Sequence, residues 1–321
     1  MRDRPPVDVL GTLLRQVRVE TSRFGRVELG APWGARVGAR DTVGLHHVLD
    51  GELWLDLADQ RAHARTGDLV VLPHGVEHTL AHQPGAPITD HAPEVGPDLS
   101  VRRRFGGDGA RAVVLCADLT VTGAARALLL RALPPIVHIR PAGPEDPVPG
   151  LPALLDTLRG EVRDGRPGAD VIAARLVELV LLQGIRAELE RPAESVPWRA
   201  ALADDRVGRA LAAIYTAAAH PWTVETLARA AGMSRAAFAP RFRELVGESP
   251  VAHLTRWRMD LAASTLRERP ELSVAQVAAT VGYASEFALS TAFRRAFGVP
   301  PGRYRAGEDS GTDDSGAEGG G

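Results

Sequence analysis

Apolar and polar residues alternate in short runs over the first 140 residues of the chain. Residues 51–57 (GELWLDL) alternate, and residues 67–73 (GDLVVLP) and 111–117 (RAVVLCA) are Val/Leu runs. Short runs of this kind, separated by turn residues, are typical of a β-sandwich or small barrel. We therefore predict such a fold here, with the Gly-, Pro- and charge-rich stretch 83–110 as a long loop.

The pattern changes after residues 141–150 (PAGPEDPVPG), which are too rich in proline for a helix or central strand and mark a boundary. Helical periodicity then predicts two helices, at 151–162 and 169–190. The apolar surface of the second helix is wider than one stripe, so it packs either on both the barrel and another subunit or on its own barrel alone. Residues 191–203 are predicted to be a linker.

The last hundred residues contain an internal repeat of fifty residues, with one residue inserted partway. The matched pairs are Thr223 with Ser273, Gly232 with Gly282, Ser234 with Ser285, Phe242 with Phe293, Gly247 with Gly298 and Pro250 with Pro301. Each copy has an N-cap residue, a short helix, a glycine turn and a second capped helix, which is the pattern of a helix-turn-helix. Ser273 and Gln276 also form a capping-box pattern.

A long helix is predicted between the two copies, from Pro250 to about Arg269. Twenty residues at 1.5 Å each span roughly 30 Å. One turn of duplex DNA is about 34 Å long, so the two second helices could enter successive major grooves on one face of the DNA. The alternative is a helical bundle that binds no nucleic acid.

Charge is distributed unevenly along the 321 residues, although the net charge is only −2. Residues 200–306 contain 14 Arg and 9 acidic residues, a net charge of +5. The rest of the chain contains 24 Arg and 31 acidic residues, a net charge of −7. The basic segment favours an anionic partner. The acidic tail 307–321 has no apolar residue larger than alanine and is expected to be disordered.

A single cysteine excludes an internal disulfide framework, and no apolar run approaches the roughly 20 residues of a membrane span. The amino terminus lacks the layout of a signal peptide. We therefore expect a soluble cytoplasmic protein without membrane partners.

Residues 204–305 resemble the tandem helix-turn-helix domain of the AraC/XylS family of bacterial transcription regulators. The similarity is carried by LARAAGMSRAAFAPRFRELVGESP and VAATVGYASEFALSTAFRRAFGVPPGRYR. The resemblance implies sequence-specific binding to double-stranded promoter DNA, usually to activate transcription through RNA polymerase and sometimes to repress it. It therefore predicts a regulator, not an enzyme.

The arginines near the repeats are expected to contact phosphates, with backbone donors at the helix N-termini beside them. For any one arginine, a solvated or salt-bridged role is the alternative. The candidates for phosphate contact are Arg235, Arg241, Arg243, Arg256, Arg294 and Arg295, with the caps Thr223, Ser234, Ser273 and Ser285. The candidates for base contact are Arg235, Ala236, Ala239 and Pro240 in the first copy and Glu286, Phe287, Ser290 and Thr291 in the second. Relatives often have a basic residue at positions 240 and 291, and Pro240 is expected to loosen its helix.

Residues 67–78 fit the second cupin motif, G-x5-P-x-G-x2-H, with His82 where many cupins have Asn. Together with HVLDGELWL (47–55), this motif makes residues 8–140 resemble the cupin half of one AraC-family branch. Relatives in that branch often have His near 46 and 78, a Cys in an LCG strand and a following LLPxxxH. This chain has LCA at 115–117 and LPPIVH at 133–138.

The first cupin motif lacks its metal ligands, because Gly38, Arg40 and Gly44 occupy those positions. The remaining candidates would suit Zn²⁺ as three imidazoles, or as two imidazoles and a thiolate. They are His46, which shares strand parity with Gly44 and so points inward, His78, His82 and Cys116. The alternatives are core histidines without a metal and, for Cys116, either a redox sensor or an inert buried thiol with a raised pKa.

These observations predict a multidomain α+β protein. A cupin-like barrel (1–140) precedes a helical dimerisation segment with its linker (141–203), a DNA-binding domain (204–306) and the tail (307–321). The leading hypothesis is a homodimeric regulator, chiefly an activator, controlled by an unidentified ligand or metal in the barrel. The alternatives are a cupin metalloenzyme fused to a DNA-binding domain and a DNA-binding dimer that needs no ligand.

Overall fold

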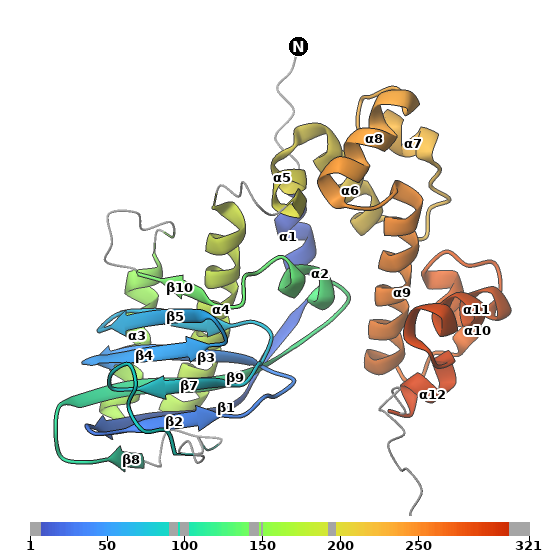
Figure 1. Ribbon diagram of the computed structural model, residues 1–321. Coiled ribbons are helices and arrows are strands. Elements are labelled where there is room, and N and C mark those ends of the chain that lie inside the picture. The colour runs from blue at the N-terminus through green and yellow to red at the C-terminus, as the bar shows by residue number, and fades with distance from the viewer. Residues whose placement is uncertain are drawn as a thin grey trace, which may run out of the picture. The chain divides into compact units, whose positions relative to one another are not determined.

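The computed structural model describes residues 8–89, 96, 103–140, 148, 150–191 and 197–307. The chain divides into two compact units, coloured along the sequence in Figure 1. The β-rich unit comprises the described residues of 18–121 and 128–192, and the helical unit those of 1–17, 122–127 and 193–321. Most of the predicted boundary at 141–150 and nearly all of the predicted tail lie outside the described residues.

Two sheets make up the β-rich unit. The six-stranded sheet has the order β10 (Val137–Ile139), β6 (Leu69–Leu72), β3 (Val43–Asp50), β9 (Arg111–Thr122), β1 (Arg18–Gly30) and β8 (Arg103–Gly106). The four-stranded sheet has the order β2 (Gly34–Val37), β7 (His78–Ala81), β4 (Glu52–Leu57) and β5 (Gln60–Arg65). The prediction of a loop over 83–110 is wrong at 103–106, because β8 pairs in parallel with the end of β1.

The main core of this unit is built from the inward positions of both sheets. Leu53, Leu55 and Leu57 of β4 are buried, whereas Trp54 and Asp56 between them are half-buried, as the alternating sequence predicted. Val48 and Val114 of the six-stranded sheet belong to the same cluster. Such alternation buries one face of each sheet against the other, which confirms the predicted β-sandwich or barrel.

Two helices, α3 (Leu151–Asp164) and α4 (Ala169–Glu190), complete this unit where the sequence predicted them. They pack on each other, and α4 also contacts β1 and β10. The Thr21 hydroxyl of β1 donates a hydrogen bond to the carbonyl of Ala174 in α4. Gly184 allows the close approach of α4 to β10, because a Cβ there would lie 3.1 Å from Ile139 Cδ1.

The helical unit contains the repeat. Its elements are α1 (Val9–Leu14), α5 (Pro197–Ala203), α6 (Asp205–Thr216), α7 (Val224–Ala230), α8 (Arg235–Val246), α9 (Pro250–Glu268), α10 (Val274–Thr280), α11 (Glu286–Phe297) and α12 (Pro301–Arg305). The boundary between the units falls within α2 (Arg126–Arg131), after residue 127. The predicted linker is wrong at residues 197–203, because α5 packs there on α6 and α8. The amino-terminal helix α1 also packs on α6.

Candidate functional site

Helices α7 and α8 form the first helix-turn-helix, and α10 and α11 form the second (Figure 1). Gly232 and Gly282 have φ of +68° and +83°, so a side chain at either position would strain the turn. The hydroxyls of Thr223, Ser234, Ser273 and Ser285 each accept a backbone N–H, which confirms all four predicted caps. The capping box of Ser273 with Gln276 is present, and Thr223 forms a second one with Thr226 that was not predicted.

Helix α9 joins the two copies as one uninterrupted helix of 19 residues. It starts at Pro250 as predicted, and the Ser249 side chain caps it by accepting the backbone N–H of Ala252. At 1.5 Å per residue it spans roughly 28 Å, close to the length of one duplex turn. The spacing between α8 and α11, which we call the recognition helices, therefore suits successive major grooves.

The six candidate arginines fall into two groups. Arg235, Arg243, Arg294 and Arg295 are exposed, and none has an ion pair with any residue that the structure describes. Arg241 instead pairs with Asp204 at 3.1 Å and Glu244 at 3.0 Å, and Arg256 pairs with Glu248. The alternative of a salt-bridged role therefore applies to these last two side chains.

The candidates for base contact are also unequal. Glu286 and Phe287 are exposed at the start of α11, and Ser290 is half-buried. The Thr291 hydroxyl is exposed but donates to the carbonyl of Phe287. Pro240 lies inside α8, which continues from Arg235 to Val246 without a break, so the expected loosening does not interrupt the helix.

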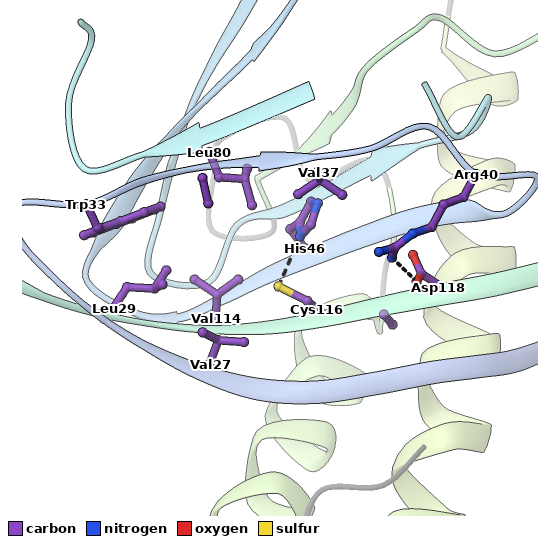
Figure 2. Close-up of a pocket in the computed structure, with 12 residues that line it drawn as sticks. Val27, Leu29, Trp33, Val37, Arg40, His46, Leu80, Val114, Cys116 and Asp118 are labelled. Carbon is purple, nitrogen blue, oxygen red and sulfur yellow. Dashed lines mark hydrogen bonds and ion pairs between the residues drawn. The ribbon is translucent and has the colours of Figure 1, made fainter. Parts of the chain in front are cut away.

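A second candidate site is an internal pocket of about 50 Å³ between the two sheets (Figure 2). Most of its wall is apolar, formed by Val27, Leu29, Trp33, Ala35, Val37, Leu80, Val114 and Ala117. Figure 2 shows His46 and Cys116 at the middle of the pocket and the Arg40–Asp118 ion pair at one end. His46 points inward, as strand parity predicted.

A chain of hydrogen bonds runs through His46 and connects the two sheets. Cys116 Sγ lies 3.3 Å from His46 Nδ1, and His46 Nε2 lies 3.1 Å from His78 Nε2. His78 Nδ1 lies 3.0 Å from the carbonyl oxygen of Val76, which can only accept. With both rings neutral, one proton arrangement fits: the thiol donates to His46, His46 donates to His78, and His78 donates to Val76.

The pKa values agree with this neutral arrangement. Burial, followed by the neighbouring His78, lowers the pKa of His46 to about 3. Burial also lowers the pKa of His78. Burial, followed by the Asp118 carboxylate, raises the pKa of Cys116 to about 12, which agrees with the alternative of an inert thiol.

This arrangement does not fit a zinc ion. Cys116 contacts Nδ1 of His46, whereas His78 faces Nε2 of the same ring, so the thiolate and the two imidazoles cannot share one metal. His82 is directed elsewhere, with Nδ1 2.7 Å from the Trp33 carbonyl oxygen. In the part of the chain that the structure describes, no group of three or more His, Cys, Asp or Glu residues could hold a metal.

Two carboxylates of the β-rich unit, each with an ionisable partner, were not singled out from the sequence. Asp118 is nearly buried and forms ion pairs with Arg40 at 2.6 Å and Arg23 at 3.1 Å, which balances a carboxylate beside the pocket. Asp68, which directly precedes β6, pairs at 2.9 Å with His138 of β10, the histidine of the 133–138 segment. The sequence did carry a signal for Asp118: it is two residues after Cys116 on the same strand, so both side chains point to the same face of the sheet.

Comparison with known proteins covers both units. The family model described as "Cupin" matches residues 8–190, and the model described as "Helix-turn-helix domain" matches residues 227–307. A putative AraC-like transcription regulator of Streptomyces lividans is 33% identical over 306 residues, which covers 93% of this chain and 98% of that protein. The regulator AlkR of Acinetobacter baylyi is 29% identical over 315 residues, which covers 93% and 99%.

Among solved structures, the DNA-binding domain of AdpA in complex with a target DNA is 36% identical over 32% of this chain and 92% of that chain, with a TM-score of 0.30. No helix in the described ranges has both the length and the apolar character to cross a membrane. The full-length relatives are named as transcription regulators, in agreement with the prediction that the chain is not an enzyme. The chain therefore belongs to the AraC family and is a DNA-binding transcription regulator that combines a cupin domain with a tandem helix-turn-helix.

Proposed function

We propose that this regulator is a homodimer whose cupin pocket binds a small effector, and that the effector changes its affinity for promoter DNA. The observation that carries the proposal is the mostly apolar pocket between the sheets, which is lined by His46, a side chain that is hydrogen-bonded to His78. An effector can act only if it binds two conformations of the protein with different affinity.

The small size of the pocket gives a reason why an effector would bind two conformations with different affinity. A cavity of about 150 Å³ accommodates benzene, whereas this pocket has a volume of about 50 Å³. A ligand of more than a few atoms therefore requires the pocket to widen, which changes the packing around His46. The lining favours a largely apolar molecule with one polar group that can bond to His46 or Arg40.

Thermal unfolding of the full chain with a panel of small, mainly apolar metabolites tests the effector. A ligand at 100 times its Kd stabilises the protein by about 2.7 kcal/mol, which raises Tm measurably. Val37→Phe, which fills part of the pocket, should abolish the shift, whereas Val76→Phe at an exposed position should retain it. If no compound raises Tm, the dimer that needs no ligand becomes the better hypothesis.

The exposed apolar side chains of α4 support the homodimer. Val171, Ile172 and Leu179 are 63%, 46% and 50% exposed, and a second copy of the same face would cover them. Ile172→Asp combined with Leu179→Asp should convert the dimer to a monomer in light scattering. Val251→Asp, at a position that is 48% exposed on α9, is the control and should leave the mass unchanged. A monomeric wild-type protein would contradict the proposal.

Four exposed arginines form no ion pair within the described ranges, and they are the best-supported phosphate contacts on DNA: Arg235, Arg243, Arg294 and Arg295. Arg241 and Arg256 become secondary, because binding would require them to leave their carboxylate partners. Activation in the cytoplasm through RNA polymerase is the expected output. Transcription by purified polymerase from a selected promoter should rise when the regulator is added, and a fall would indicate a repressor.

We also retain the predicted division into a cupin-like domain, a helical dimerisation segment, a DNA-binding domain and a tail. One modification is supported by the packing of α5 on α6 and α8, which favours starting the DNA-binding domain near residue 197. Limited proteolysis should release a fragment that starts between 191 and 197. Cleavage within 197–203 instead would favour the original boundary at 204.

A further inference from the structure

Phe287 is the most exposed large hydrophobic residue in the described part of the chain. Its side chain is 80% exposed, in the first turn of recognition helix α11. Leaving a phenylalanine in water forgoes the favourable burial that this side chain usually gains. The position of this ring on a recognition helix, and not its exposure alone, is what points to a ligand.

The fold of α11 does not require an apolar residue at this position. Leu289 and Phe293 form the buried face of α11, and Phe287 is two residues before Leu289, about 200° around the helix at 3.6 residues per turn. Phe287 instead lines up with Thr291 and Arg294, which follow at i+4 and i+7 and are exposed. Phe287 thus lies on the same face as a candidate base contact and a candidate phosphate contact.

The major groove contains one prominent apolar group, the C5-methyl of thymine, and a phenylalanine side chain can contact it. We infer that Phe287 contacts the C5-methyl group of one thymine and makes that position of the operator selective for a methylated pyrimidine. This inference rests on the proposed entry of α11 into the major groove. The corresponding residue of the first copy is Ala236, whose single methyl group gives a much smaller contact.

The test uses the full chain and a duplex obtained by selection from random sequences. Each thymine is replaced in turn by deoxyuridine, which lacks only the methyl group. At one position the wild-type protein should lose about fourfold in affinity, the value expected for one buried methyl-sized group. At that position 5-methylcytosine paired with guanine should also bind more tightly than cytosine paired with guanine.

Phe287→Ala should bind the thymine and deoxyuridine duplexes equally well, and Phe287→Leu should keep part of the preference. Val251→Ala removes another exposed apolar side chain of the same unit and should keep the full preference.

The inference is overturned if the wild-type protein binds a specific sequence but never distinguishes thymine from deoxyuridine, or if Phe287→Ala keeps the preference. In that case a protein partner is the better explanation for the exposed ring. If the wild-type protein shows no sequence preference on any duplex, the proposed role of α11 itself fails.

Discussion

The two candidate sites of this regulator, one in each unit, hold their ionisable side chains in opposite environments. In the β-rich unit, His46, His78 and Cys116 are brought together inside the sandwich, and their pKa values shift toward the neutral forms. In the helical unit, arginines such as Arg235 and Arg294 are exposed and lack carboxylate partners among the described residues. A buried neutral site responds to shape and hydrogen bonding, whereas an exposed charged surface responds to other charges and to salt.

Acid should therefore act first on the β-rich unit, with the largest effect. His46 has a folded pKa of about 3 and an ordinary value of 6.5, so the unfolded state binds more protons below pH 6.5 and stability falls with pH until about pH 3. The loss is about 1.4 kcal/mol per pH unit, or roughly 3 kcal/mol at pH 4.5. Buried His47, with a pKa of about 4, adds to it.

Urea unfolding of the full chain at pH 7 and pH 4.5 measures this loss. His46→Gln should reduce the pH dependence, because glutamine cannot gain the proton. His220→Gln, at an exposed histidine of the helical unit, should leave it unchanged. An equal pH dependence in all three proteins would remove the contrast between the units.

Sequence preference should depend on the helical unit and on Glu286 in particular. A carboxylate in the major groove accepts a hydrogen bond from the N4 amino group of cytosine, and one such contact discriminates against other bases by about 1–3 kcal/mol. Glu286→Ala should therefore change the sequences selected at one base pair. Glu271→Ala removes an exposed carboxylate outside the recognition helices and is the control. Uniformly weaker binding by Glu286→Ala would assign this residue a structural role.

The two copies of the repeat should depend equally on their caps. Ser273→Ala and Thr223→Ala each remove a side chain that takes part in a capping box, at a cost of about 1 kcal/mol each. Urea unfolding measures both losses, and Ser273→Asp should retain most of the stability. If only one of the two substitutions lowers the free energy of unfolding, the capped helix of the other copy is stabilised by tertiary packing alone.

The smallest expected effect is on the salt dependence of DNA binding. Removing one phosphate contact lowers the slope of log K against log salt by about 0.9. Arg294→Ala should show this change, and Arg241→Ala a smaller one, because Asp204 and Glu244 already pair with Arg241. Titrations at several salt concentrations compare the two variants. Equal changes would mean that Arg241 leaves its partners on DNA.

Local signals explain what the sequence predicted well. A serine three residues before a glutamine is enough to form the capping box at Ser273, and strand parity is enough to direct His46 inward. The cupin motif did not predict the place of His82, because β7 ends at Ala81 and Nδ1 of His82 is hydrogen-bonded to the Trp33 backbone. The ion pair of Arg241 with Asp204, 37 residues apart, depends on tertiary packing that one sequence does not encode locally.

Helix α9 has a consequence for the promoter itself. It joins two recognition helices that present different side chains, with Arg235 and Ala236 on one and Glu286 and Phe287 on the other. The DNA site that one chain covers therefore has a direction. If the site is inverted, each recognition helix meets the half-site that suits the other helix. A promoter can use this polarity to fix on which side of the bound protein transcription begins, even where only one chain is bound.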